Sequence, residues 1–128
     1  MNKTVSLTVA VIAVFLVSGV FVAAPSVASG SVTVSLGPTN LCGTTDLYVW
    51  GSVSPPPHRV GTNVAVSITN PFGSAVDVNQ FQVHPYSGWY LGTFVTGGRL
   101  YKVRGTYTVT VNYNGATMSA TFTYRARC

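Results

Sequence analysis

The chain has 128 residues, 47% of them hydrophobic, and carries a formal net charge of +5 at pH 7. Its only carboxylate side chains are Asp46 and Asp77, too few to supply the six or more oxygen ligands of a calcium site. The positive charges are sparse rather than gathered into a stripe, so the composition argues against nucleic-acid binding.

Residues 1–28 predict an export segment. Lys3 gives the positive start, residues 5–24 are almost continuously apolar, and Ser26-Val27-Ala28 has the small residues of a cleavage site. The apolar run is also long enough to span a bilayer, so an uncleaved anchor helix is the alternative. In either case residues 29–128 are expected to form one domain, secreted or held at the cell surface.

Cys42 and Cys128 both fall in the exported part. An even number of cysteines in an oxidising compartment predicts one disulfide bond, which would tie the start of the domain to its last residue. Closing so long a loop contributes on the order of 4 kcal/mol in the chain-entropy account. Because Cys128 is terminal, an intermolecular bridge is the alternative.

Short segments with β-type patterns follow one another along the rest of the chain, with Pro, Gly and Asn turns between them. The strands expected from them cover residues 31–36, 47–53, 63–69, 76–83, 89–95, 106–113 and 116–124. No segment after residue 28 has helical spacing of any length. About seven strands in a domain of this size predict an all-β, immunoglobulin-like antiparallel sandwich, preceded by the N-terminal signal or anchor helix.

The last two strands carry the clearest pattern. In residues 106–113 large apolar residues alternate with Thr and Asn, and the alternation resumes after Asn114-Gly115, which predicts a two-residue hairpin. Such a ribbon has one apolar face and needs a second sheet to cover it. Tyr107 stands where these sandwiches place a tyrosine whose hydroxyl bonds back to an earlier loop.

Three motifs extend this pattern. Residues 61–73 end in V-x-I-x-N-P-x-G, residues 97–113 join a Gly-Gly loop to G-T-Y-x-V-x-V-x-Y, and residues 121–124 read T-F-T-Y. With these motifs the chain resembles the immunoglobulin-like domains of exported archaeal surface proteins, which are similar to macroglobulin-like and fibronectin-like modules. The resemblance implies a fold and a location, and it supplies no catalytic residue.

Groups for catalysis or metal binding are few. Asp46 and Asp77 lie in separate segments rather than as the carboxylate pair of a glycosidase. No nucleophile elbow accompanies His58 or His84, and the histidines and cysteines lack the short ligand spacing of zinc or copper sites. We therefore expect no enzyme activity, no metal and no cofactor.

Aromatic residues are the first candidates for partner binding. Tyr86, Trp89 and Tyr90 lie close together in the chain and would form a stacking platform if exposed. Trp50 is open to two interpretations, core or surface, because both faces of residues 47–53 are apolar.

Basic residues are the second candidates. Arg99, Lys102 and Arg104 alternate with apolar residues in the connection before Tyr107 and would suit an anionic polymer. Arg125 and Arg127 would join this patch if the last strand ends nearby.

These features favour a non-enzymatic cell-surface module with a structural or adhesive role, whose partner is a protein or an anionic polysaccharide. Nucleic acid is not expected as a partner, and a membrane is expected only through an uncleaved N-terminal segment. A second hypothesis is a filament subunit, in which the segment around Val32 and Val34 adds as a strand to the open edge of a neighbouring copy. A third is a secreted inhibitor or carbohydrate binder that uses the aromatic platform.

Overall fold

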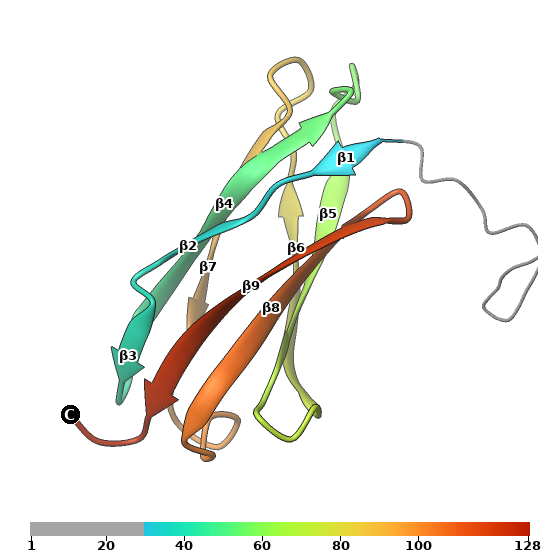
Figure 1. Cartoon of the computed structure of the whole chain (residues 1–128). Coiled ribbons are helices and arrows are strands. Elements are labelled where there is room, and N and C mark those ends of the chain that lie inside the picture. The colour runs from blue at the N-terminus through green and yellow to red at the C-terminus, as the bar shows by residue number, and fades with distance from the viewer. Residues whose placement is uncertain (1–29) are drawn as a thin grey trace, which may run out of the picture.

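The computed structural model describes residues 30–128, and the export or anchor segment predicted for residues 1–28 lies outside them. The described residues form nine strands and no helix, arranged as two sheets that pack face to face (Figure 1). Accordingly, this part of the chain has no helix of the length and apolarity that a membrane span requires.

The smaller sheet has four strands. Its centre is β4 (Asp46–Ser54), which pairs antiparallel with β7 (Trp89–Val95) on one side. On its other side β4 pairs with β1 (Ser31–Val32) and then with β2 (Ser35–Gly37), so that these two short strands follow one line along it.

The larger sheet has five strands in the order β3-β9-β8-β5-β6. Four of them pair antiparallel with one another: β5 (Asn63–Thr69), β6 (Ala75–Gln82), β8 (Gly105–Tyr113) and β9 (Ala116–Arg125). The fifth, β3 (Asn40–Cys42), lies parallel to the end of β9 (Figure 1). This arrangement of two sheets is that of an immunoglobulin-like sandwich.

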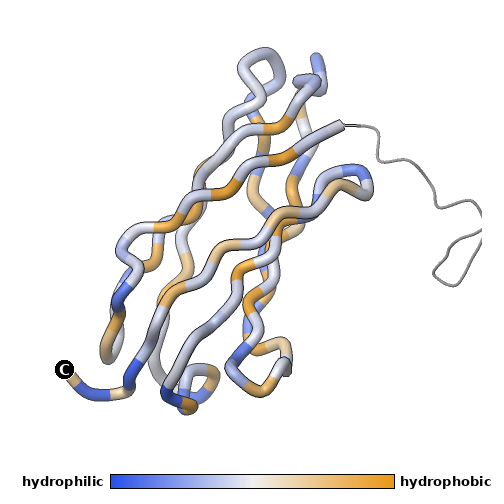
Figure 2. The backbone as a smooth tube through the Cα atoms, viewed as in Figure 1, coloured by the Kyte–Doolittle hydropathy of each residue, from blue (hydrophilic) through white to orange (hydrophobic). Residues whose placement is uncertain are grey.

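The core lies between the sheets and is formed by the apolar residues of the alternating patterns. Figure 2 shows hydrophobic segments alternating with paler ones along the strands. Val109 and Val111 of β8 are fully buried, and Thr108 and Thr110, which alternate with them, face the other side of the sheet. On β4 the inward side is formed by Leu47, Val49 and Val53. Each of these side chains contributes roughly 1.5–3 kcal/mol when it leaves water, so the period-two pattern fixes which face of each strand is buried.

The expected hairpin joins β8 to β9. Tyr113 pairs with Ala116, and both residues of the Asn114-Gly115 turn have positive φ, 50° and 87°. Two positive φ values are the requirement of a type I′ turn, which explains the Asn-Gly sequence.

Tyr107 closes one end of the sandwich. Its hydroxyl donates a hydrogen bond of 2.5 Å to the carbonyl of Val103, four residues upstream, and its ring stacks on Phe122 with 5.3 Å between centroids. Tyr101 and Tyr124 pack against the same ring. Desolvation by burial raises the pKa of the Tyr107 hydroxyl.

The disulfide between Cys42 and Cys128 forms within the chain, as predicted, with 5.1 Å between the two Cα atoms. It links β3 to the segment that follows β9, across 86 residues. Immunoglobulin domains of antibodies instead link the two sheets through their second and sixth strands. The bridge here secures the short parallel pairing at the edge of the larger sheet.

The structure differs from the sequence-based prediction at the start of the domain. The single strand expected over residues 31–36 is interrupted at Thr33 and Val34, giving β1 and β2. The connection expected between residues 36 and 47 contains β3, because the chain crosses there to the larger sheet and buries Leu41 in it. Val32 pairs with Val53 of its own chain, so the segment considered for strand addition to a neighbour is already part of this sheet.

Candidate functional site

The outer side of the smaller sheet carries exposed aromatic residues. On β4, Tyr48 and Trp50 alternate with the buried Leu47 and Val49 and are 45% and 37% exposed. The structure thus places Trp50 on the surface rather than in the core, because Leu47, Val49 and Val53 on the other side of β4 take the inward positions.

Strand β7 extends this surface. Trp89, Leu91 and Val95 point outward with more than half of each side chain exposed. In the register of the two strands Leu91 lies opposite Trp50, and Trp89 is two pairs further along, opposite Ser52. Diagonal neighbours in such a pair stand within reach of large side chains. We call this surface the aromatic face: Tyr48, Trp50, Trp89, Leu91 and Val95.

One end of the aromatic face is hollowed. The hollow has a volume of about 620 Å³, and none of its lining residues is a carboxylate, Lys or Arg. It is lined by Trp50, Gln82, Val83, His84, Pro85, Trp89, Tyr90 and Leu91.

Tyr90 does not belong to the aromatic face. It follows Trp89 in an extended strand and therefore points to the opposite side, where it is only 3% exposed. Its hydroxyl donates a hydrogen bond of 2.6 Å to the carbonyl of Thr33. The platform expected from three neighbouring aromatic residues is thus corrected: Tyr90 is part of the core.

Tyr86 lies in the turn before β7 and is 68% exposed. Its ring meets His58 edge to face, with 5.7 Å between centroids. The turn is held by His84, whose Nδ1 accepts hydrogen bonds from the backbone N–H groups of Tyr86 and Ser87 at 3.3 and 3.1 Å. His84 therefore holds the turn, and His58 packs against the exposed ring of Tyr86.

The expected basic residues lie in the connection between β7 and β8. Arg99, Lys102 and Arg104 are exposed, whereas Tyr101 between them is buried and donates to Asp77 Oδ2 at 2.9 Å. Burial and this hydrogen bond raise the pKa of Tyr101. The connection is therefore pinned to β6, and its basic side chains are left facing solvent.

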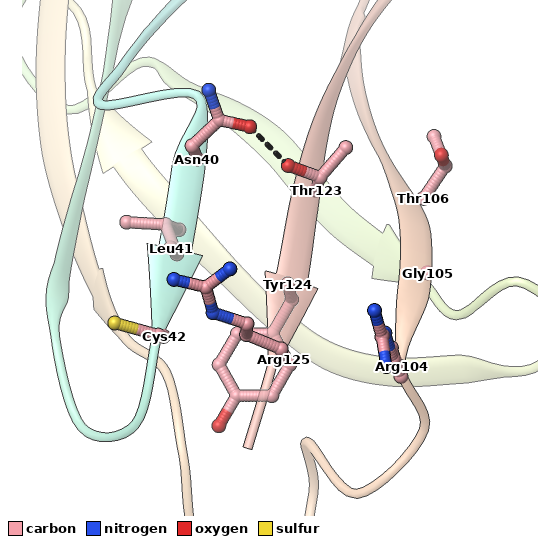
Figure 3. A pocket seen from close by; sticks show the side chains of 9 residues that line it. All are labelled: Asn40, Leu41, Cys42, Arg104, Gly105, Thr106, Thr123, Tyr124 and Arg125. Atoms are coloured by element: carbon pink, nitrogen blue, oxygen red, sulfur yellow. Dashed lines mark hydrogen bonds between the residues drawn. The ribbon is translucent and has the colours of Figure 1, made fainter. Parts of the chain in front are cut away.

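The structure brings Arg104 together with Arg125, and not with the aromatic face. Both line a groove of about 360 Å³ over the ends of β3, β8 and β9 (Figure 3). The residues that complete this lining were not singled out from the sequence, because Asn40, Thr106 and Thr123 meet only through sheet pairing. Of the candidates named from the sequence, Trp89 thus belongs to the aromatic face and Arg104 to the groove, whereas Arg99 and Lys102 line neither.

The two carboxylate side chains lie on different sheets and do not form a pair. Asp46 lies on β4 of the smaller sheet, and Asp77 on β6 of the larger one, where it accepts the Tyr101 hydroxyl. Among residues 30–128, no group of three or more His, Cys, Asp or Glu side chains is placed to hold a metal ion.

Comparison with known proteins gives similarity in structure only. No protein-family model and no curated protein matches the sequence. Among solved structures, part of the alkylpurine DNA glycosylase AlkC from Pseudomonas fluorescens, bound to DNA containing an abasic-site analogue, is similar over 77% of this chain, with 16% identity and a TM-score of 0.54. The matched region covers 31% of the glycosylase, so this chain spans less than a third of that protein.

Two further similarities are weaker. An immunoglobulin-like protein from Pseudomonas aeruginosa is matched over 77% of this chain and 94% of its own, with 12% identity and a TM-score of 0.49. A β-glucosidase from Listeria innocua in complex with glucose is matched over 77% of this chain and 16% of its own, with 12% identity and a TM-score of 0.46. At these identities the similarity concerns the fold and transfers no activity.

Proposed function

We propose that this chain is a non-catalytic adhesive module outside the cytoplasm, which binds a partner protein through the aromatic face. The observation that carries the proposal is the group of exposed aromatic and aliphatic side chains on the outer side of β4 and β7. Exposed apolar surface of this kind costs free energy in water, and in soluble proteins it marks interaction sites.

A protein is a better partner than a sugar for the whole face. Leu91 and Val95 are aliphatic and more than half exposed, and aliphatic side chains offer no flat ring for a sugar to stack on. Trp and Tyr surrounded by aliphatic contacts are typical of the residues that dominate protein–protein binding energies. Of the seven register pairs between β4 and β7, the four that face outward carry this surface along the full length of β7, which suits an extended contact.

The disulfide bond supports the compartment in this proposal. A disulfide persists in oxidising surroundings, and Cys42–Cys128 supports a place outside the cytoplasm. The predicted export segment is consistent with this location.

The proposal is tested by binding labelled protein to the surface of its producing cells. We expect the double variant Trp50→Ala/Trp89→Ala to bind at least about tenfold more weakly than the wild type, since such residues commonly contribute 2 kcal/mol or more. The matched control is Thr117→Ala/Thr121→Ala, which changes two exposed residues of the other sheet and should bind as the wild type does.

Treatment of the cells identifies the partner class. Protease treatment should abolish binding, and periodate oxidation of glycans should leave it intact. Binding that survives both tryptophan substitutions, or that is lost only after periodate, contradicts the proposal. If the protein binds only to itself in sedimentation experiments, the face is an interface between copies.

A further inference from the structure

The groove beside Arg104 and Arg125 is a second surface with a different chemistry (Figure 3). It lies on the outer side of the larger sheet, away from the aromatic face. Two rows of side chains cross it, as the pairing of the strands requires: a polar row of Asn40, Thr123 and Thr106, and a basic pair at the ends of β8 and β9.

The two arginines border the groove from different strands. Arg125 extends across toward β3, and Arg104 stands on the other side of Tyr124, one residue before β8 (Figure 3). Neither carboxylate side chain of the protein lines the groove, since Asp46 and Asp77 lie elsewhere. Its charge is therefore positive and uncompensated by its own lining.

The backbone under both arginines is fixed. The carbonyl of Arg125 accepts the N–H of Gly43 at 3.0 Å, next to the disulfide at Cys42. Arg104 directly follows Val103, whose carbonyl receives the Tyr107 hydroxyl. A ligand that meets these side chains does not have to order a loop first, which lowers the cost of binding.

The polar row adds hydrogen-bonding groups beside the charges. The Thr123 hydroxyl donates to Asn40 Oδ1 (Figure 3), which orients the Asn40 amide. Thr106 stands at the far end of the row and is exposed. Guanidinium groups next to an amide and hydroxyls match a ligand in which anionic groups alternate with alcohol groups.

We propose that this groove binds the anionic groups, carboxylate or sulfate, of an acidic polysaccharide. A guanidinium pairs with either group through two parallel N–H bonds. A nucleic acid fits less well, because it presents dense phosphates that call for a stripe of basic residues, and here two arginines face a row of neutral groups. The inference does not depend on the partner of the aromatic face.

Binding to defined polysaccharides tests the proposal. The probes are dextran sulfate and alginate, with neutral dextran and single-stranded DNA of similar length for comparison. We expect binding to one or both anionic polysaccharides, weakening as salt increases. Arg104→Gln and Arg125→Gln should each weaken it about tenfold, the effect of losing a charged hydrogen-bonding partner.

Matched variants separate a site from general charge. Arg59→Gln removes the same charge from the connection between β4 and β5 and should leave binding within about twofold, because it lies outside the groove. Trp50→Ala/Trp89→Ala should also leave it unchanged, so failure of the aromatic face and failure of the groove give different results. Equal weakening by Arg59→Gln, tighter binding of DNA than of either polysaccharide, or no binding to the anionic polysaccharides would overturn the proposal.

Discussion

The hydroxyl of Tyr90 crosses beneath β4 and donates its hydrogen bond to the carbonyl of Thr33 at 2.6 Å. This carbonyl has left the ladder between the first strands and β4, and the Thr33 hydroxyl takes its place by accepting the N–H of Ser52 at 2.9 Å. The crossing is possible because residue 51 is glycine; a Cβ there would collide with the Thr33 carbonyl. The hydrogen bond thus connects the gap between β1 and β2 to β7, which pairs with the other edge of β4.

Loss of the Tyr90 hydroxyl should destabilise the domain. In Tyr90→Phe the buried ring remains, but the Thr33 carbonyl loses its donor, and we expect the free energy of unfolding to fall by about 1–3 kcal/mol. Urea unfolding measures the change. Tyr86→Phe is the control, since that residue is exposed, and its value should stay within about 0.5 kcal/mol of the wild type. Equal stability of the two variants would mean that the crossing bond contributes nothing.

Stability should decline in alkaline solution. Burial raises the pKa of Tyr90 to about 12 from its ordinary value of 10.0, and it raises the pKa of Tyr101 and Tyr107 as well. Between pH 10 and about pH 12 the folded state keeps the Tyr90 proton that the unfolded state has lost. The contribution of the neutral Tyr90 hydroxyl to the free energy of unfolding is therefore complete below pH 10 and disappears as the pH rises toward 12. Urea midpoints across this range measure it, and Tyr90→Phe should show a shallower decline. A flat profile, with the disulfide intact by mass, would contradict the expectation.

Tyr107→Phe tests the tyrosine at the end of the sandwich. The ring stays between Phe122 and Tyr124, but the Val103 carbonyl loses a close hydrogen bond. We expect a loss of about 1–3 kcal/mol, together with faster amide exchange in the connection that carries Arg104. If exchange there is unchanged, the hydroxyl does not order this connection.

Reduction of the disulfide should cost more than either hydroxyl. The bridge closes a loop across 86 residues, which corresponds to about 4.5 kcal/mol in the chain-entropy account. The urea midpoint in the presence and absence of reductant measures the effect, and the mass should rise by two hydrogen atoms per chain on reduction. The variant Cys42→Ala/Cys128→Ala is the control, because reductant should no longer change its midpoint.

Local patterns were sufficient for most of the fold. The alternation around Val109 and Val111 and the Asn114-Gly115 turn gave the hairpin, since burial of one face and the turn geometry both depend on neighbouring residues. Strand β3 was missed because its three residues include one core side chain, and its pairing with β9 is a contact between distant parts of the chain.

The surfaces were predictable only in part. Trp89 and Tyr90 are adjacent in a strand, so alternation alone requires that they face opposite sides, a signal that was available in the sequence. Counting pairs back from the hairpin turn also brings Arg104 level with Arg125, as the pairing of Gly105 with Tyr124 shows. Asn40 joins that groove through the parallel pairing of β3, for which the sequence carries no local signal.

The outer edge of the larger sheet is capped by its own side chains. β6 has no neighbour beyond β5 among the described strands, and an open edge of this kind invites pairing with another chain. Here the N–H of Val78 donates to Asp77 Oδ1 at 3.0 Å, and the N–H of Gln80 donates to Asn79 Oδ1 at 2.8 Å. These bonds occupy donors that an added strand would use.

Removal of one cap should therefore promote association. We expect Asn79→Val to sediment as larger species at concentrations where the wild type does not, because its Gln80 N–H is free and its side chain favours strands. Asn112→Val is the matched control: it makes the same replacement at an exposed position of β8, a strand paired on both sides. Asp77 is unsuitable for this test because it also accepts the Tyr101 hydroxyl. If the two valine variants associate to the same extent, added apolar surface is the cause, and the side-chain cap is not what keeps the edge of β6 unpaired.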